Sequence, residues 1–539
     1  MPRDRVPKLC GADVELGNFI LGVERAGGTG GAASRALLRE VEAPYAERSG
    51  YGVSIPASGG GHRVATWDPQ DWGRKYLAGN GGCIYIDLDH LECCVPEVRS
   101  AWDHVAAWHA MLRIARGAMD AANAKLPAGQ RICVLVNNSD GRGNAYGSHL
   151  NFLVTRRAWD NIFARKLHHL LYLAAFQVSS IVYTGQGKVG AENGTPPAAF
   201  QLSQRADFFE TLTGAQTTHQ RPIVNSRDEP LCGERPGWVG GGARLPDQAR
   251  VHCIFFDNTL CHGSSLLKVG TMQLVLAMLE AERANPALLL DDPVSAVVQW
   301  SHDPTLTARA PTASGQRVTA VELQLRFLEE ARRFAASGGF DDVVPRAGEI
   351  LALWEDTLAK LAACDVIGLA SRVDWVLKFR ILQRAVQRHG LRWSSPEIKH
   401  LDHLYGSLDP GEGLYWTYEQ AGAVERVVAD DAIERFVHEP PEDTRAWTRA
   451  MLLRRAGAGG IDDVDWDTIR IRQTGAGYWP VLRTLRLDDP LGFTRADVGH
   501  VFRDAAALDD LVDALQAHAG VETSATPPTS SNDEMEEVP

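Results

Sequence analysis

Features that would assign this chain to a membrane or secreted class are missing from its 539 residues. No apolar run reaches the roughly 18–20 residues that a membrane-spanning helix needs. The N-terminus, Met1-Pro2-Arg3-Asp4-Arg5, has none of the apolar core of a secretory signal. We therefore expect a cytoplasmic protein that does not bind a membrane.

Cysteine pairs and net positive charge are also lacking. The nine cysteines form no C-x-x-C pair and their number is odd, so free thiols are expected rather than a disulfide framework. Cys83, His90, Cys93 and Cys94 match no usual zinc-site spacing. The net charge of −13 disfavours a nucleic-acid partner. The chain has no Walker A, G-x-S-x-G or H-E-x-x-H motif.

Length and hydropathy patterning indicate more than one folded part. A chain of 539 residues with 45% hydrophobic residues is too long for one simple core. Pro440-Pro441 interrupts the pattern and marks a boundary. We expect a main domain over residues 1–439 with a mobile insertion at 27–62, a small α+β domain over 440–517 and a disordered tail over 518–539.

Periodicity predicts individual elements within these parts. Ser100 and Thr319 are expected to cap helices. Short, mainly apolar runs predict strands at 84–87, 131–137, 150–155 and 250–256, with the second and third paired with each other. Apolar residues at helical spacing predict helices at about 34–42, 101–123, 158–177, 264–283, 319–336, 346–363, 372–389 and 396–405.

Acidic residues at strand spacing suggest a cation site. Asp13 and Glu15 lie two residues apart, so on a strand both side chains point to one face. Asp87, with Glu92 close behind it, directly follows an apolar strand. Hard carboxylate oxygens are suitable Mg²⁺ ligands, and a carboxylate at a strand end can act as nucleophile or general base. The alternatives are a solvated strand edge for the first pair and a charged turn for the second group.

Histidines and arginines complete the candidate site. His149 with Asn151, and His252, lie on apparent strands, where each histidine could face a site or be buried for structural reasons. Arg205 and Arg227 flank turn-forming sequence, and arginine forks suit phosphate oxygens, although ion pairing is an equal alternative for each. The combination indicates an enzyme that uses Mg-ATP and acts on a carboxylate or an amide.

Taken together, the segments resemble the Pup ligase/deamidase family of glutamine-synthetase-like enzymes over residues 10–505. The stretches that carry the resemblance include Phe200-Gln-Leu-Ser-Gln-Arg-Ala-Asp-Phe208, Arg221-Pro-Ile-Val-Asn-Ser-Arg-Asp-Glu-Pro230, Thr319-Ala-Val-Glu-Leu-Gln324 and Pro440-Pro-Glu-Asp-Thr-Arg445.

The resemblance implies an α+β fold, in which a curved antiparallel sheet backed by helices precedes a small C-terminal domain. It implies ATP and Mg²⁺ as cofactors and Pup or a Pup-like tail as partner. Family ligases join the C-terminal glutamate of Pup to a lysine, and family deamidases hydrolyse the C-terminal glutamine amide or the isopeptide bond. By position, Asp87 is implied as the catalytic aspartate with Tyr85 beside it. Metal ligands are implied at Asp13, Glu15, Glu92 and His252, and nucleotide or scissile-group contacts at Arg205 and Arg227. His149 and Asn151 are expected to bind the cofactor as well.

Three features are similar to the deamidase branch, one of them the segment Phe200-Gln-Leu-Ser-Gln-Arg-Ala-Asp207. Glu92 follows Asp87 by five residues, as in that branch, and Glu42-Ala-Pro44 lies in an insertion before the catalytic strand. We therefore expect a hydrolase, with a ligase as the alternative.

Departures from the family pattern motivate a third reading. Asp13 stands in place of a glutamate, Leu16 in place of an aromatic residue, and Leu150 in place of a glutamate of an H-E-N motif. The last change predicts that the site has lost a carboxylate. A pseudoenzyme that binds a Pup-like tail without turnover is therefore also considered.

Overall fold

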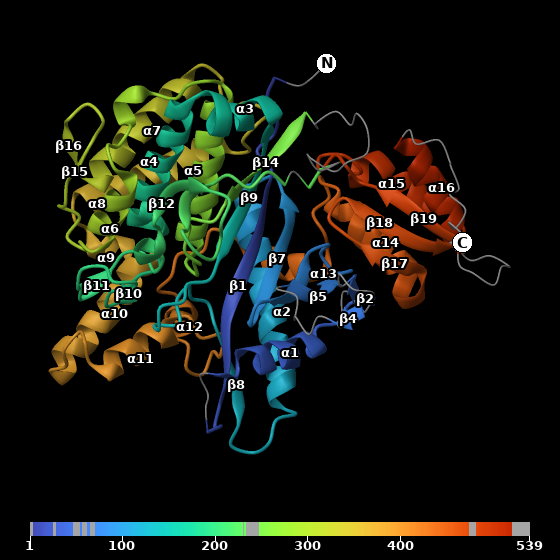
Figure 1. Ribbon diagram of the computed structural model, residues 1–539, viewed down its shortest axis with the longest axis horizontal. Helices are drawn as coiled ribbons and strands as arrows, with labels where there is room; N and C mark the ends of the chain where they lie inside the picture. Colours follow the sequence, from blue (N-terminus) through green and yellow to red (C-terminus); the bar gives the residue numbers. More distant parts are fainter. Residues whose placement is uncertain are drawn as a thin grey trace, which may run out of the picture.

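An antiparallel sheet of eight strands forms the centre of the protein, and helices cover one of its faces (Figure 1). The computed structural model describes residues 4–24, 28–46, 54–56, 62–64, 71–229, 231–232, 247–473 and 481–519. The strand order is β14 (Gln248–Cys253), β9 (Ser148–Thr155), β1 (Cys10–Leu21), β7 (His90–Val98), β6 (Cys83–Asp87), β5 (Asp71–Tyr76) and β2 (Tyr45–Ala46), with β8 (Arg131–Leu135) paired to the far end of β1.

Strict alternation of side chains gives this sheet two different faces. On β1, Ala12, Val14 and Leu16 are buried in the hydrophobic core, whereas Asp13 and Glu15 point to the other side. Helices α1 (Gly30–Glu40), α2 (Ala101–Asn123) and α5 (His262–Glu280) pack against the apolar face, and every residue of α5 is buried. The polar face is therefore the one that is left for a functional site.

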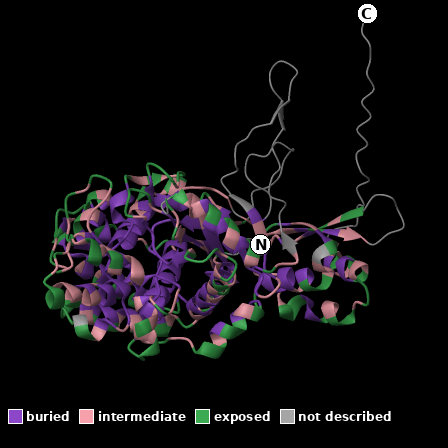
Figure 2. Ribbon diagram, turned by 90° about the horizontal axis from the view of Figure 1, so that it is seen from below, coloured by how far each residue is buried: buried purple, intermediate pink, exposed green. Residues whose placement is uncertain are grey.

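Further helices complete the larger part of the molecule, and Figure 2 shows buried residues filling its interior. They are α3 (Arg156–Asp160), the π-helical turn η2 (Asn161–Arg165), α4 (Leu167–Thr184), α6 (Pro293–Ser301), α7 (Ala320–Ala336), α8 (Ala347–Ala362), α9 (Val366–Leu369), α10 (Asp374–His389), α11 (Pro396–Tyr405), α12 (Leu414–Gln420) and α13 (Asp430–His438). None of the helices in the described ranges is long and apolar enough to cross a bilayer.

Short elements connect these layers. The 3₁₀ turns are η3 (Ala206–Phe208) and η4 (Pro286–Leu288). The two-stranded ribbons are β3 (Ser54–Pro56) with β4 (His62–Val64), β10 (Lys188–Val189) with β11 (Phe200–Gln201), β12 (Thr211–Gly214) with β13 (Pro222–Asn225), and β15 (Ala310–Pro311) with β16 (Arg317–Val318).

The C-terminal elements pack around their own three-stranded sheet beside β5, β6 and β7 (Figure 1). They are α14 (Ala446–Gly460), β17 (Ile461–Val464), β18 (Thr468–Gln473), β19 (Val481–Arg486), α15 (Arg495–Asp504) and α16 (Leu508–His518). Their apolar cluster includes Trp447, Leu453 and Ile469 and extends to Tyr76 and Cys83 of the large sheet. The two parts therefore share a buried interface. The expected tail lies outside the described residues from 520 onward, as does part of the expected 27–62 insertion.

Most predicted elements are present within a few residues of their expected bounds. Ser100 accepts a hydrogen bond from the backbone of Asp103, and Thr319 forms a capping box with Glu322, as predicted. The helix expected at 158–177 is broken, because Lys166 leaves the helical region at φ −131° and ψ 83°. The predicted pairing of strands 131–137 and 150–155 is wrong. Both pair with β1 instead, because its twelve residues are long enough to hold β9 and β8 one after the other.

The helix expected at about 34–42 begins earlier than predicted, since α1 already starts at Gly30. A Cβ atom on Gly31 would lie 2.4 Å from Asp89 Oδ1, so glycine lets α1 approach the β6–β7 turn without displacing the Asp89 side chain.

Candidate active site

Five strands place the predicted site residues on the polar face of the large sheet. In the β1–β9 register Asp13 lies opposite His149, and in the β1–β7 register Glu15 lies opposite Glu92. Tyr85 on β6 lies opposite Glu92, and His252 on β14 lies opposite Asn151. Directly opposed residues of antiparallel strands share a face, so segments from residue 13 to residue 252 meet at one surface.

One end of this face is organised by Asn151. Its side-chain nitrogen donates to Asp13 Oδ1, and its Oδ1 lies 2.8 Å from His252 Nδ1. His149 Nδ1 lies 3.2 Å from the second oxygen of Asp13. Although burial alone would raise it, the pKa of Asp13 lies well below its usual value, because His149 donates a hydrogen bond and nearby positive charge stabilises the carboxylate.

The centre of the face holds a group of carboxylates. Glu15 accepts hydrogen bonds from the backbone N–H of Gly147 and from His90, each at 2.9 Å. Glu92 is 2% exposed, and its Oε2 accepts no hydrogen bond from the residues that the structure describes. Burial raises the pKa of Glu92 well above its usual value, and the charges of Asp13 and Glu15 raise it further.

Asp87 ends strand β6 at the edge of this carboxylate group. Its register partner is His90, and the turn between them contains Leu88 at φ 51°. A bulky residue in the left-handed region costs about 1–2 kcal/mol, so the turn is held by its surroundings rather than by local preference. The charge of Asp87 is close enough to Glu92 to raise the pKa of Glu92.

Two adjoining chambers open on the polar face. A C-terminal chamber of about 510 Å³ lies between the sheet and the C-terminal elements, and its lining includes Asp13, Tyr85, Glu92, His252 and Trp466. A loop chamber of about 810 Å³ is bounded by residues 137–147 and 217–221 and includes Glu15. Asp87, His149 and Thr217 line both chambers. These three residues therefore mark where the chambers meet.

The two predicted arginines occupy different places. Arg227 lines the C-terminal chamber. Arg205 is fully buried, lines neither chamber, and donates to the carbonyl oxygens of Ile254 and Phe256. Burial, with help from the charge of Arg221, lowers the pKa of Arg205 to about 9. Among the described residues, Arg205 therefore has no direct contact with either chamber.

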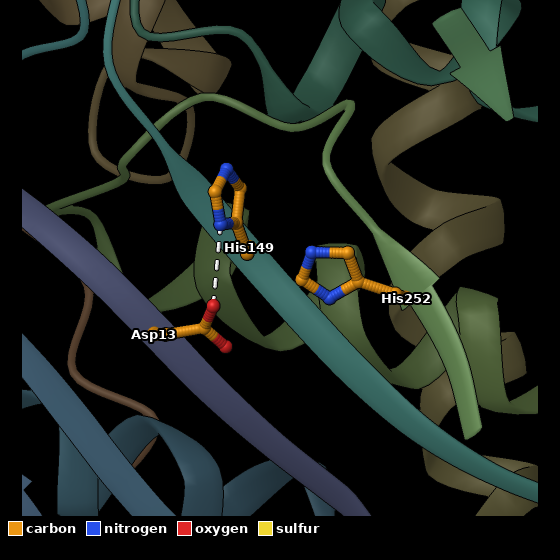
Figure 3. A group of neighbouring side chains, drawn as sticks. All are labelled: Asp13, His149 and His252. Atoms are coloured by element: carbon orange, nitrogen blue, oxygen red, sulfur yellow. Dashed lines mark hydrogen bonds and ion pairs between the residues drawn. The ribbon is translucent and has the colours of Figure 1, made fainter. Parts of the chain in front are cut away.

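The carboxylate group fits a divalent cation. Glu92 contributes a buried oxygen without a hydrogen-bond partner among the described residues, and neighbouring carboxylates of like charge surround it. A hard cation ligated by oxygens would offset that repulsion and satisfy the orphaned atom. Asp13, His149 and His252 each place a ligand atom within 4.8 Å of the others (Figure 3). Glu15 and Glu92 on the same face add carboxylate oxygens of the kind that Mg²⁺ prefers.

Leu150 requires a correction to the sequence interpretation. It lies opposite Ala12 and Cys253 and is 1% exposed in the apolar core. A carboxylate at position 150 would therefore point toward the helices rather than toward Asp13 and His149. The expectation that Leu150 removes a carboxylate from this site is wrong. The reason for considering a pseudoenzyme therefore no longer holds.

Several residues of the site were not singled out from the sequence. Arg250 donates to Asn151 Oδ1 at 2.8 Å and to the carbonyl oxygen of Glu229 at 2.6 Å. It lies two residues before His252, so strand alternation would have placed it on the same face. Arg74 stacks over the Tyr85 ring at 3.9 Å, and Trp466 enters from the C-terminal part. Neither has a local signal, because both reach the site through distant packing.

Comparison with known proteins identifies the relatives of this chain. A depupylase of Acidothermus cellulolyticus is 36% identical over 81% of this chain and 82% of the relative. A Pup–protein ligase of Micrococcus luteus is 34% identical over 80% of this chain and 90% of the relative. A Pup deamidase/depupylase of Mycolicibacterium smegmatis is 33% identical over 88% of this chain and 90% of the relative.

Solved structures agree on the fold. The ligase PafA in complex with the prokaryotic ubiquitin-like protein Pup superposes with a TM-score of 0.74 at 23% identity, covering 95% of this chain and 93% of PafA. PafA in complex with ADP gives a TM-score of 0.68 at 25% identity, covering 83% of this chain and 90% of PafA. The chain thus has the glutamine-synthetase-like α+β fold that was expected. The model of the Pup-ligase protein family matches residues 31–470, and the chain therefore belongs to the Pup-ligase family.

Proposed function

We propose that this protein is a Mg-ATP-dependent hydrolase that acts on Pup or a Pup-like tail, cleaving the C-terminal glutamine amide or the isopeptide bond to a conjugated protein. The observation that carries the proposal is the position of Asp87. It ends β6 where the two chambers meet, beside the buried carboxylates of Glu15 and Glu92. A carboxylate there can reach a bond that is presented from one chamber to a cofactor in the other.

The relatives support this choice of reaction and of cofactors. Two of the three relatives described above are named for depupylation, and the five-residue spacing from Asp87 to Glu92 resembles the deamidase branch. ADP in the PafA complex supports a nucleotide as cofactor. We assign it to the C-terminal chamber, where Arg74 and Arg227 offer guanidinium groups and Trp466 offers an aromatic surface. The tail then enters the loop chamber, which is lined by Arg142 and Arg221.

The chemistry assigned to Asp87 is attack on the amide carbon or activation of the water that attacks it. The C–N bond breaks, a C–O bond forms, and the nitrogen leaves as ammonia or as a lysine amine carrying the proton from water. Glu15, Glu92 and Asp13 would hold Mg²⁺, and the bound ion would neutralise their negative charge. Arg227 and Arg250 provide positive charge near the developing oxyanion.

A ligase is the second candidate, because the Micrococcus luteus relative is named a Pup–protein ligase at nearly the same identity. In that reaction a γ-glutamyl phosphate forms from ATP, and a lysine amine then displaces phosphate. ADP would accumulate in step with the conjugate. Hydrolysis of an amide, by contrast, consumes no ATP overall.

Mass spectrometry of the full chain with Mg-ATP tests the proposal. The substrates are Pup ending in glutamine, Pup ending in glutamate and a Pup-conjugated protein, with ADP followed in parallel. We expect loss of the amide or release of Pup, and a loss of activity by about 10²-fold or more in Asp87→Asn. Asp463→Asn is the control, because it makes the same chemical change in an exposed ion pair of the C-terminal sheet that lines neither chamber.

The outcomes separate the candidates. Asp87-dependent formation of a conjugate with ADP would assign the ligase reaction. Equal hydrolysis by Asp87→Asn and the parent would remove Asp87 from the reaction. Bound ATP with no turnover of any substrate would count against both enzymes.

A further inference from the structure

The two arginines that line the loop chamber are used differently. Arg221 is buried and donates to the carbonyl oxygens of Thr217 at 2.8 Å and Ala145 at 3.0 Å, so it joins the two loops that bound the chamber. The Arg142 side chain is exposed and makes no hydrogen bond or ion pair with the residues that the structure describes. Its charge is therefore available to an anionic group that enters the chamber.

The backbone on both sides of Arg142 is held by Glu192. Oε1 of Glu192 accepts a hydrogen bond from the N–H of Gly143 at 3.1 Å, and its Oε2 accepts one from the Ser139 hydroxyl at 2.5 Å. Asp140 closes the turn from within, because its Oδ1 accepts from the N–H of Arg142 at 2.7 Å. Side-chain contacts therefore fix the path of residues 139–143, and with it the place from which the Arg142 side chain starts.

Glu192 is itself anchored in a buried ion cluster. Lys188 is 1% exposed, and its Nζ lies 2.9 Å from Glu192 Oε2 and 2.9 Å from Asp207 Oδ2. Asp207 also accepts from the backbone N–H of Glu192 at 2.8 Å and lies 2.8 Å from His302 Nε2. None of these four residues lines either chamber, so the cluster can act on a bound ligand only through the loop that it holds.

We propose that Arg142 determines specificity by binding a carboxylate of the tail that enters the loop chamber, and that Glu192 is the positioning residue that presents Arg142 to it. The chamber is also lined by carboxylates, among them Glu15, Asp87 and Glu210, which repel an anionic tail. The guanidinium of Arg142 offsets that repulsion. A guanidinium–carboxylate pair is bidentate, so it gives orientation as well as affinity.

This inference deepens the proposed function, and it rests on that function for the entry of the tail into the loop chamber. Its test measures the binding of Pup without any cleavage, so the two can fail separately. Pup that is cleaved by the parent and bound equally well by Arg142→Met would overturn this inference alone. Pup that is bound through Arg142 but never cleaved would count against the hydrolase alone.

The experiment is a fluorescence-anisotropy titration of the full chain with labelled Pup ending in glutamate, which has no amide to cleave. Arg142→Met and Glu192→Ala should each raise the Kd by about 10-fold. Because Glu192 acts through Arg142, the double variant should bind no more weakly than either single variant. Arg384→Met is the control, since it removes an exposed arginine of α10 that lines neither chamber, and it should bind like the parent. In hydrolysis of Pup ending in glutamine, the loss should appear in KM rather than in kcat.

Two altered forms of Pup identify the carboxylate that Arg142 binds. Amidation of the C-terminal α-carboxylate removes one source. Replacement of the acidic residues upstream of the terminal one by asparagine and glutamine removes the other. The form that lacks the partner of Arg142 should bind the parent about 10-fold more weakly, and Arg142→Met should cause no further loss with it.

A parental Kd in Arg142→Met would overturn the proposal, as would losses that multiply in the double variant. Full dependence on Arg142 with both altered forms of Pup, or no binding of Pup by the parent, would overturn it as well. Circular dichroism shows whether each variant is folded. If Glu192→Ala is unfolded, Ser139→Ala decides instead, because it removes one hydroxyl contact to Glu192 and should raise the Kd by about threefold.

Discussion

Strand β7 carries two buried glutamates in opposite electrostatic surroundings. Glu97, 8% exposed, contacts Arg445 Nε at 2.8 Å and also pairs with Arg449. Burial alone would raise the pKa of Glu97, but the charges of Arg449 and Arg445 lower it to about 2. Glu92, at 2% exposed, is also buried but faces other carboxylates, and its pKa is raised.

The two glutamates of β7 therefore have different roles: Glu97 holds parts of the protein together, and Glu92 belongs to the candidate site. Glu97 joins β7 to α14, and Arg449 also donates to the carbonyl oxygens of Gly81 and Trp466, so this ion cluster connects the sheet to the C-terminal elements. Glu92 has no such cationic partner among the described residues. Its charge is uncompensated by the protein, which is the arrangement expected of a group that meets a cation or a substrate.

The largest effect is expected where the compensated cluster is broken. Arg449→Met removes one cation and leaves Glu97 buried with less compensation, which typically costs about 3–5 kcal/mol of unfolding free energy. Urea denaturation measures the change. Arg470→Met, which breaks an exposed pair with Asp463, should cost less than about 1 kcal/mol. Equal losses in the two variants would show that the buried cluster contributes nothing special.

The next largest effect is expected in how the stabilisation by Glu97 depends on pH. Because its folded pKa of about 2 lies below the usual value of 4.5, the stabilisation is present above pH 4.5 and is lost as the pH falls toward 2. Glu97→Gln should therefore be less stable than the parent by about 3 kcal/mol at neutral pH. The two proteins should converge below pH 4.5. A constant difference across this range would contradict a titrating ion cluster.

The local sequence pattern predicted the acidic face that holds Glu92, but not the ion cluster around Glu97. The spacing of Asp13 and Glu15, and of Asp87 and Glu92, predicted a shared acidic face, because alternation along a strand is a local property. The Glu97–Arg449 contact joins positions far apart in the chain, and neither residue carries a local signal. Helices with long apolar periodicity, such as α2 and α10, were likewise predictable.

Strand pairing shows the same limit. The predicted hairpin of 131–137 with 150–155 failed, because partner choice depends on the length of β1 rather than on either segment. Leu150 was misassigned to the site because motif position alone does not give the face of a strand. Alternation from His149 would have placed Leu150 in the core.

Glu92→Gln tests the uncompensated member of the pair. Because the folded pKa is raised, metal-free stability of the parent should fall as the pH rises above 4.5, and the variant should lack that fall. At neutral pH the variant should be the more stable protein yet bind Mg-ATP at least about 10-fold more weakly, as expected when a metal site is disturbed. Calorimetry measures the affinity. The exposed Glu349→Gln is the control, with stability within about 0.5 kcal/mol of the parent. A variant that loses stability at neutral pH would contradict the assignment of Glu92.

The smallest effect is expected from removing a single hydroxyl, that of Tyr85, beside Glu92. Where Glu97 has two arginines, Glu92 has the hydrogen bond of Tyr85, which lowers its pKa against burial and the neighbouring carboxylates. Tyr85→Phe keeps the ring beneath Arg74 but removes this bond, at a cost of about 1 kcal/mol, so Mg-ATP affinity should fall about fivefold. Tyr76→Phe deletes a buried hydroxyl on the next strand, 3.4 Å from Asp465, and should leave the affinity unchanged. Unchanged affinity in Tyr85→Phe would mean that the hydroxyl does not help to keep Glu92 ionised for the cation.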